Sequence, residues 1–352
     1  MNCKRLSNAI PFILLSFSFS MAWLSCTDPV NNNDEPIDRP REWHFLGLGE
    51  ESITAFAVDP TDEDILFAGS SSNFSDGTVG GIFRSIDGGA AWDTLIRGVT
   101  VRDIDIHPSD HQIVYVTCGM NYLTPQGLLR TTDGGESWEA VSGIVLNPDE
   151  GLSVCAIDPS SPDTMYVGSS GLFGGHLLRS IDGSQTWSVV STSFMDLNGI
   201  TALLIDPENP NNVYVGTSEI GLILHSDDYG ENWEQLDFPA VGLVNQLAYI
   251  QGADRLLCAC TWYFGFYYSS DDGLTWSREN QGLPNPISVS SICSDGDSLY
   301  IAAGGYGAFS SNMTDTLHWH AFGDSLFSKA SIVYSEKNHS VFVGTAGVYS
   351  FR

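Results

Sequence analysis

The chain is poor in positive charge. Its 352 residues include 14 lysines and arginines against 43 aspartates and glutamates, which gives a formal net charge of −29. Lysine occurs only at positions 4, 329 and 337. Because this balance repels polyanions, we expect neither nucleic acid nor anionic lipid as a partner of the folded domain. We interpret the acidic surface as a source of solubility in an extracellular or salty medium; attraction of a cationic partner is the alternative.

A cysteine framework is also lacking. Beyond Cys3 and Cys26, five cysteines remain at positions 118, 155, 258, 260 and 293, and an odd number cannot pair completely within one chain. They stand beside Val, Leu and Ala in predicted strands, so we expect small buried apolar residues. Cys258 and Cys260 have no second pair to complete a zinc site, and the histidines are scattered. We therefore expect no metal and no cofactor.

Long apolar runs and helical periodicity are absent after residue 24. The stretch from Ala9 to Leu24 is apolar, is interrupted by Pro11 and serines, and follows Lys4 and Arg5. This pattern is typical of a signal peptide rather than of a membrane-spanning helix. We assign the signal peptide to residues 1–25.

The end of that stretch, Trp23-Leu24-Ser25-Cys26, resembles a bacterial lipoprotein box, with Trp23 where the family usually has Leu. The resemblance implies that Cys26 is lipidated and holds the protein at a bilayer. Cleavage near Ser25 with a chance cysteine is the alternative. Residues 26–40 are polar, acidic and proline-rich, so we interpret them as the lipidated cysteine and a flexible tether. We expect an outer-membrane or cell-surface lipoprotein, or a secreted protein, that meets the membrane through this lipid only.

Tryptophan recurs at regular intervals of 46, 49, 46, 43 and 43 residues, from Trp92 to Trp319. Five of these tryptophans close the motifs SIDGGAAW, TTDGGESW, SIDGSQTW, SDDYGENW and SSDDGLTW, which we call the box turns. The residues that define them are Ser85, Asp87, Gly89, Trp92, Asp133, Gly135, Trp138, Ser180, Asp182, Trp187, Ser226, Asp228, Gly230, Trp233, Ser269, Asp271, Gly273 and Trp276. Before Trp319 the motif is replaced by SSNMTDTLH, and Ser184 replaces a glycine in the third turn. This period predicts a β-propeller.

Each box turn has a local explanation. The Asp carboxylate can accept bonds from backbone N–H groups while glycine takes positive φ, and the Trp ring can pack between sheets. The motif resembles that of the Asp-box, or BNR-repeat, group, which includes sialidases, two-propeller xyloglucanases, sortilin-type domains and relatives of the photosystem II stability factor. The resemblance covers about four fifths of the chain. It implies that the box turns are structural, lie between the third and fourth strands of each blade, and are far from any active site.

A second repeated phrase, strand–turn–strand, occurs seven times. Its copies start at Ile53, Val101, Leu152, Ile200, Val244, Ser288 and Ser331. Seven copies predict seven four-stranded blades in residues 41–352. The last blade lacks a fourth strand, which Trp43–Gly47 can supply because that segment matches the one after the first box turn. We therefore predict an all-β, seven-bladed propeller, closed by its N-terminal strand and monomeric.

The loops opposite the box turns carry the residues that we expect to bind a ligand. Aromatic side chains there could stack on sugar rings or anchor a peptide. These candidates are Tyr122, Phe173, Trp262, Tyr263 and Tyr306. The alternative is that the rings plug the channel or cover neighbouring loops. We expect a non-catalytic binding or assembly module of the cell envelope, with a protein or glycan ligand.

The alternative function is a carbohydrate-active enzyme, a glycoside hydrolase or lyase. A sialidase-like site needs an arginine triad that this chain does not supply, since Arg84, Arg130 and Arg179 precede box turns. A xyloglucanase-like site needs two propellers facing each other. If a single propeller were catalytic, its acidic loop residues would act, and the candidates are Asp196, Glu150 and Asp324.

Overall fold

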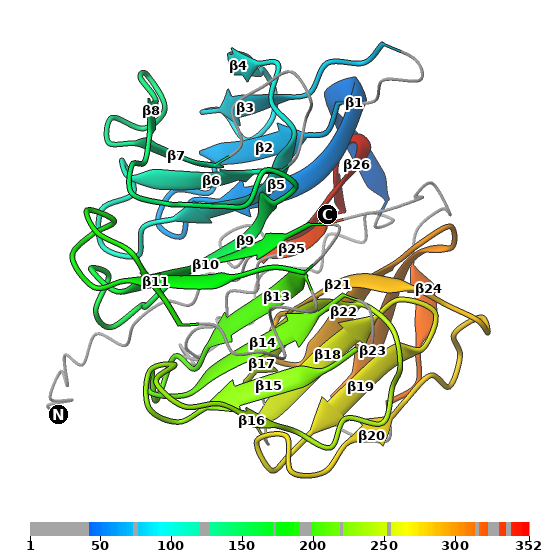
Figure 1. Ribbon diagram of the computed structural model, residues 1–352. Helices are drawn as coiled ribbons and strands as arrows, with labels where there is room; N and C mark the ends of the chain where they lie inside the picture. The colour runs from blue at the N-terminus through cyan, green and yellow to red at the C-terminus, as the bar shows by residue number, and fades with distance from the viewer. Residues whose placement is uncertain are drawn as a thin grey trace, which may run out of the picture.

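The computed structural model describes residues 42–72, 77–119, 127–171, 174–190, 199–218, 221–251, 255–313, 317–322, 331–335 and 339–351. In this part the secondary structure is entirely β, and consecutive antiparallel sheets follow one another in chain order (Figure 1). Within these residues, no helix has the length and apolar character needed to cross a membrane. The predicted signal peptide, Cys26 and the tether lie outside the described residues.

Six of the blades take their strands in simple sequence order. Blade 1 contains β1 (Trp43–Val58), β2 (Leu66–Ser70), β3 (Gly81–Ser85) and β4 (Asp93–Arg97). Blade 2 contains β5 (Val101–Ile106), β6 (Val114–Cys118), β7 (Gly127–Thr131) and β8 (Glu139–Ala140). Blade 3 contains β9 (Gly151–Ile157), β10 (Met165–Ser170), β11 (Leu177–Ser180) and β12 (Ser188–Val189). Blade 4 contains β13 (Ile200–Ile205), β14 (Val213–Thr217), β15 (Ile223–Ser226) and β16 (Glu234–Gln235). Blade 5 contains β17 (Val244–Ile250), β18 (Leu256–Thr261), β19 (Gly265–Ser269) and β20 (Ser277–Arg278). Blade 6 contains β21 (Val289–Ser294), β22 (Ser298–Ala303), β23 (Gly307–Asn312) and β24 (His320–Phe322).

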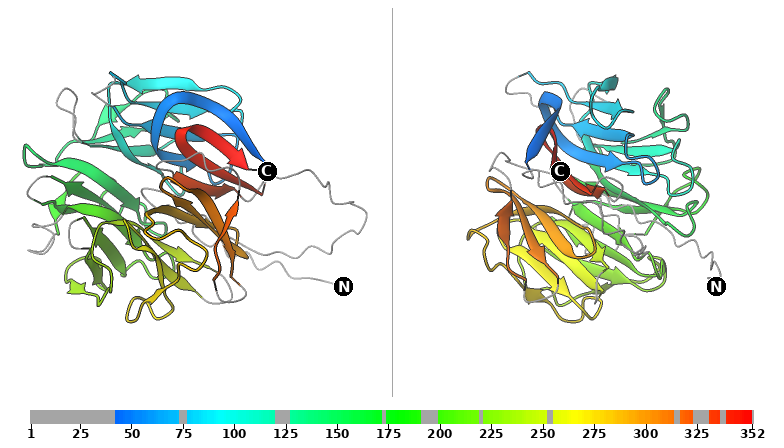
Figure 2. Two further views of the ribbon diagram at one scale, coloured as in Figure 1. Left: turned by 90° about the vertical axis from the view of Figure 1, so that its right-hand side faces the viewer. Right: turned by 180° about the vertical axis from the view of Figure 1, so that it is seen from behind.

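The seventh blade joins the two ends of the described chain. It contains β25 (Ser331–Ser335), β26 (Ser340–Phe351) and the first part of β1, and this makes one continuous six-stranded sheet with blade 1. Trp43 pairs with Phe351 and Phe45 with Tyr349. The two strands, β1 in blue and β26 in red, lie side by side in Figure 2. The Trp43 ring also lies 5.6 Å from that of Phe322 in blade 6. The predicted closure by the N-terminal strand is therefore confirmed, as is the all-β fold.

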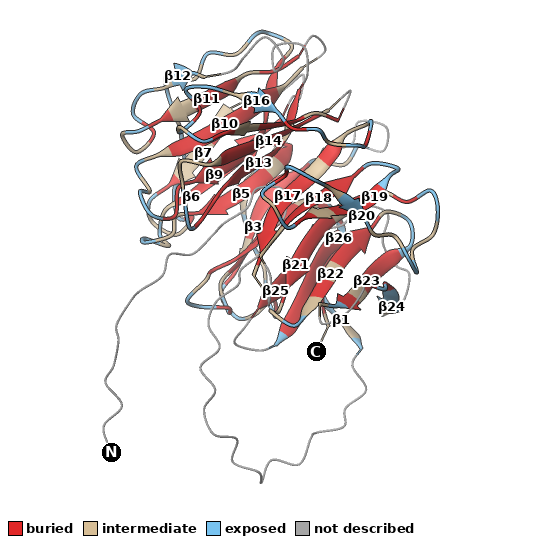
Figure 3. Ribbon diagram, turned by 90° about the horizontal axis from the view of Figure 1, so that it is seen from below, coloured by how far each residue is buried: buried red, intermediate tan, exposed pale blue. Residues whose placement is uncertain are grey.

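Burial decreases from the first strand of each blade to the last. Strand β9 is buried at every residue, whereas β12, β16 and β20 are exposed at every residue (Figure 3). The reason is that first strands pack against neighbouring blades on both faces, while the short outermost strands reach solvent.

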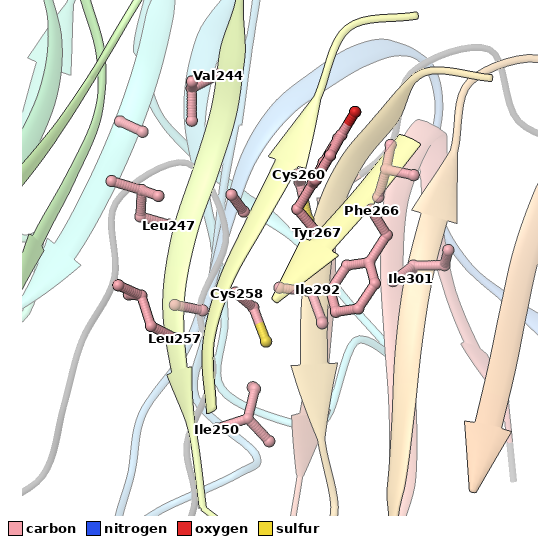
Figure 4. Close-up of a cluster of buried hydrophobic side chains, with 14 of the residues drawn as sticks. Val244, Leu247, Ile250, Leu257, Cys258, Cys260, Phe266, Tyr267, Ile292 and Ile301 are labelled. Atoms are coloured by element: carbon pink, nitrogen blue, oxygen red, sulfur yellow. The ribbon is translucent and has the colours of Figure 1, made fainter. Parts of the chain in front are cut away.

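The core lies between adjacent blades. Figure 4 shows Phe266 of blade 5 beside Ile292 and Ile301 of blade 6, with Cys258 in the same cluster. All five described cysteines are free and buried, as predicted, and burial raises the pKa of the Cys118 thiol to about 12. These thiols serve as small packing groups, because the thiolate that would react is strongly disfavoured.

Candidate functional site

The antiparallel connections give the disc two faces. The turns between first and second strands share one face with the box turns, which we call the box face. The turns between second and third strands, and the segments that lead from one blade to the next, lie at the opposite ends of the same strands, and we call this the loop face. The two faces differ in how regular their contacts are.

On the box face the same contacts recur in every described box turn. In the first, Ser85 Oγ lies 2.9 Å from Asp87 Oδ1 and accepts the Gly89 N–H at 2.8 Å, while Asp87 Oδ1 accepts the Ala91 N–H at 2.8 Å. Two consecutive residues take positive φ in each turn. Ser184 does so at 69° where the other turns have glycine. The turn lies between the third and fourth strands, as predicted.

Hydrogen bonds hold the box carboxylates in their charged form. Donation from Ser137, Thr186 and Asn232 is the largest cause that lowers the pKa of Asp133, Asp182 and Asp228, respectively, to about 2. These aspartates are therefore ionised and already occupied at neutral pH.

Arginines link the second, third and fourth box turns to the blade before each of them. Arg84 donates to the Gly134 carbonyl at 2.7 Å and pairs with Glu136 of the second turn. Arg179 makes the same contacts with Tyr229 and Glu231 in blade 4. The arginines before the box turns therefore lie on the box face, as their position in the sequence predicts, and they join neighbouring blades there.

The loop face carries exposed aromatic rings on blades 5 and 6. Trp262, Tyr263 and Phe264 form the turn between β18 and β19 and are 38%, 55% and 36% exposed. Tyr306, in the corresponding turn between β22 and β23, is 46% exposed. The Trp262 and Tyr263 rings meet edge to face with centroids 5.4 Å apart. We call these four residues the aromatic patch.

Backbone contacts fix the first of these turns. The Trp262 N–H donates to the Leu243 carbonyl at 2.9 Å, and the Phe264 carbonyl accepts from Arg278 Nε at 2.9 Å and from Asn280 Nδ2 at 2.8 Å. Tyr263 has φ = 70°, a conformation that costs a non-glycine residue about 1–2 kcal/mol. Residues held in this way are common at binding sites.

Ser288 joins the two aromatic turns. Its Oγ accepts the Tyr263 N–H at 3.1 Å, and its carbonyl accepts the Gly304 N–H at 2.8 Å, two residues before Tyr306. The rings of both blades are thereby placed on neighbouring turns of one face. Sequence reasoning found three of these aromatic residues as candidates, but no sequence signal marks Ser288 as the link between them.

Glu150, the described member of the predicted carboxylate group, is only 3% exposed. Asn147 Nδ2 donates to its Oε1, and its Oε2 lies 3.0 Å from Ser169 Oγ and 2.9 Å from His176 Nδ1. Both carboxylate oxygens are therefore occupied by side chains of blade 3. The arrangement positions the loop before β9, and it leaves the imidazole of His176 as the more accessible group.

Blade 1 repeats this arrangement with Arg97 in the place of the histidine. Glu51 is 8% exposed; its Oε2 accepts from Ser70 Oγ at 2.7 Å and its Oε1 from Arg97 at 2.6 Å. Beside this pair, Glu50 and Val79 line an open cleft of about 430 Å³. Buried glutamates at this position thus join strands on the loop face.

The other predicted site residues cannot be placed. Asp196, Asp324, Tyr122 and Phe173 lie outside the described residues. Among the described residues, no group of three or more His, Cys, Asp or Glu side chains is arranged to hold a metal ion.

The sequence is similar to part of two much larger enzymes. It is 26% identical over 213 residues to a xyloglucanase of Paenibacillus sp. and 26% identical over 196 residues to the xyloglucanase Xgh74A of Acetivibrio thermocellus. The matches cover 51% and 50% of this chain but only 19% and 22% of those enzymes. The chain thus matches about a fifth of the length of these relatives. No protein-family model matches it.

Solved structures match over a larger share of the chain. YCF48 from Cyanidioschyzon merolae aligns with a TM-score of 0.61 at 15% identity, over 88% of this chain and 98% of that one. The fold is a β-propeller. An ancestral GH74 enzyme aligns with a TM-score of 0.64 at 15% identity, over 89% of this chain and 46% of the enzyme chain. The structure of YCF48 bound to D1 peptide aligns with a TM-score of 0.62 at 14% identity, over 89% of this chain and 95% of that one. At these identities the propellers share the fold.

Proposed function

We propose that this propeller is a non-catalytic glycan-binding module whose loop face takes the ligand at the aromatic patch. The observation that carries the proposal is the exposure of Trp262, Tyr263 and Tyr306 on turns held in place through Ser288. Flat rings in a fixed arrangement stack on the apolar faces of sugars, and their polar edges can bond to hydroxyl groups. Sequence similarity to xyloglucanases supports a glycan as the ligand.

The proposal places the box turns in the Asp-box group and gives them a structural role. In four of the five turns both carboxylate oxygens accept hydrogen bonds, from Ser, Thr or Asn side chains and from backbone N–H groups, and in the first turn Asp87 Oδ1 does. This leaves the loop face as the surface for the ligand.

Hydrolysis would need a carboxylic acid free to give a proton to the leaving group. Glu150 is buried and hydrogen-bonded through both oxygens, which favours a positioning role for it. Of the three predicted carboxylates, Asp196 and Asp324 remain as candidates for the catalytic alternative.

A protein ligand is the second candidate. It is favoured because this chain aligns with nearly the whole length of YCF48, one structure of which holds D1 peptide, whereas it aligns with less than half of the GH74 enzyme. The same aromatic turns would then anchor apolar side chains.

The test is binding and turnover on neutral β-glucan and xylan oligosaccharides, with an unrelated peptide panel beside them. We expect binding without released sugar, weakened at least about tenfold by Trp262→Ala or Tyr263→Ala. Released product that is lost in Asp196→Ala or Asp324→Ala would establish the enzyme instead. Binding of peptides but of no glycan would establish the second candidate.

We also propose that Cys26 is acylated and tethers the propeller to the cell envelope, since its sequence context resembles a lipoprotein box. Labelling with a fatty-acid analogue in a bacterial host should mark the parent and not Cys26→Ser. Equal labelling of both would refute the anchor.

A further inference from the structure

One side-chain position joins neighbouring blades around the loop-face end of the first strands. Thr54 Oγ1 donates to the Val101 carbonyl of the next blade at 2.7 Å, and Thr201 Oγ1 to the Val244 carbonyl at 2.7 Å. In blade 3 Ser153, and in blade 5 Asn245, bond to the next blade in the same way. Each stands at the β-bulge near the start of the first strand of its blade. Small polar side chains therefore connect the blades here.

In blade 2 this position is Arg102, beside the bulge between Val101 and Asp103. Its side chain lies against the backbone at Gly119: a Cβ at that residue would stand 2.3 Å from Arg102 Nε and 2.7 Å from its Cγ. Gly119 is thus required for Arg102 to lie where it does.

A backbone hydrogen bond of Gly119 shows where Arg102 lies along the axis of the propeller. The Gly119 N–H donates to the Thr100 carbonyl at 2.9 Å, the same contact that Trp262 makes with Leu243 in blade 5. Arg102 therefore lies at the level of the aromatic patch, on the same face of the propeller.

Within the part of the chain that the structure describes, Arg102 differs from the other arginines in having no partner. Of the seven arginines in the described residues, the other six donate to a carboxylate or a backbone carbonyl: Arg84, Arg97, Arg130, Arg179, Arg255 and Arg278. Arg102 donates to no group in this part of the chain. Its nitrogens nevertheless keep contact with solvent, since none is among the fully buried atoms that lack a partner.

A half-buried guanidinium without a partner is poorly solvated. Burial lowers the pKa of Arg102, and no carboxylate among the described residues opposes that shift. The group remains fully cationic at neutral pH, because the ordinary pKa of arginine is so high. A ligand that brought a carboxylate would supply the missing counter-charge and two parallel hydrogen bonds.

We propose that Arg102 binds the carboxylate of a uronic acid carried by a mainly neutral glycan. The inference rests on the proposed glycan-binding function and adds an acidic group to the ligand. The net charge of −29 restricts the choice further, since a densely charged polyuronate would be repelled as a whole. A single carboxylate on an otherwise neutral chain satisfies Arg102 without that repulsion.

Glucuronoxylan, whose acidic groups are isolated, is the probe, and the same polymer with its carboxyl groups reduced to hydroxymethyl groups is the matched neutral ligand. Titration calorimetry on the parent should show about tenfold or greater preference for the acidic form, and polygalacturonate should bind weakly. Arg102→Thr should bind both forms equally. Threonine occupies this position in blades 1 and 4, so the variant should melt as a folded protein.

Two further variants sharpen the result. Arg102→Lys keeps the positive charge but cannot make the two parallel hydrogen bonds of a guanidinium group, so it should retain only part of the preference for the acidic polymer. Arg84→Gln changes the net charge as much as Arg102→Thr but lies on the box face, so it should behave as the parent. Loss of the preference in Arg84→Gln would mean that net charge, and not Arg102, reads the carboxylate.

A direct readout is the Nε–H resonance of Arg102 in a nitrogen-15 spectrum, assigned by its absence in Arg102→Thr. Sodium glucuronate should shift it and glucose should not. Equal binding of the acidic and reduced polymers would overturn this inference alone. No binding of either would overturn the glycan-binding function as well. A shift caused by a peptide with a free C-terminus, but not by glucuronate, would overturn the assignment to a uronic acid.

Discussion

The two faces of the disc are built on different principles. On the box face, five turns repeat one set of hydrogen bonds, and arginines join them from blade to blade. On the loop face, corresponding positions differ: the residue after the second strand is Gly119 in blade 2 and Trp262 in blade 5. Repetition is what stability needs, since every blade must pack on the next. Recognition of a ligand needs side chains that differ from blade to blade, because a ligand contacts some blades and not others.

Both faces depend on ring closure, so removing it should give the largest effect. A protein that starts at residue 48 loses the pairing of Trp43 and Phe45 with β26, whereas one that starts at residue 42 keeps it. We expect the shorter protein to lose at least about 3 kcal/mol of unfolding free energy, from several hydrogen bonds and the Trp43 contacts. Urea unfolding of the two proteins measures this. Equal midpoints would show that the ring does not close through β1.

The box face should be the next most sensitive. Arg255 pairs with Asp206, which is 1% exposed on its side chain, and its guanidinium lies 3.7 Å from the centroid of Tyr249. Arg255→Ala removes both contacts but leaves Asp206 its backbone donors from Glu208 and Asn209. We expect a loss of about 2 kcal/mol, measured by chemical unfolding, with glycan affinity unchanged. A weaker affinity in the folded variant would break the separation of the faces.

The box aspartates should give the box face a characteristic acid response. Because the folded pKa of Asp133, Asp182 and Asp228 is about 2, below the ordinary value of 3.8, their stabilisation is complete above that ordinary value. It is lost as the pH falls through about 2. The melting temperature of the parent should therefore drop over this range, and that of Asp228→Asn, which cannot titrate at this turn, should drop less. Parallel curves for the two proteins would contradict this role.

The smallest effects on stability are expected at two tyrosines with positive φ, one on each face, and their effects on glycan binding should differ most clearly. Tyr263 on the loop face and Tyr229 in a box turn both have positive φ, at 70° and 59°. Replacing either by glycine relieves backbone strain, so we expect stability to stay level or rise by up to about 1 kcal/mol. Only Tyr263→Gly should weaken glycan binding. If Tyr229→Gly weakened it equally, the ligand would contact both faces.

The extent to which the sequence predicts this molecule follows from the same contrast. The spacing of Trp92 and its successors predicts the box turns, the seven strand–turn–strand phrases predict the blades, and the match of Trp43–Gly47 to a fourth strand predicts the closure. All three are visible because each blade makes the same local contacts. The loop face depends on contacts that occur once. No repeat reveals that Glu150 is held by His176, or that Ser288 joins two aromatic turns.

Arg102 shows why such features escape sequence reasoning. Its importance lies in a register position shared with Thr54 and Thr201 and in the absence of a partner within the described residues, and neither is visible before the strands are aligned in space. The aromatic candidates are visible in the sequence because the repeat places Trp262, Tyr263 and Tyr306 in turns on the face opposite the box turns.

Hydrogen–deuterium exchange of the full chain with and without a bound xylan or β-glucan oligosaccharide tests the assignment of the faces most directly. The account predicts slower exchange at residues 261–265 and 304–307 on binding, and unchanged exchange at the box turns from residue 85 to residue 276. Protection confined to the box turns, with residues 261–265 unaffected, would contradict it.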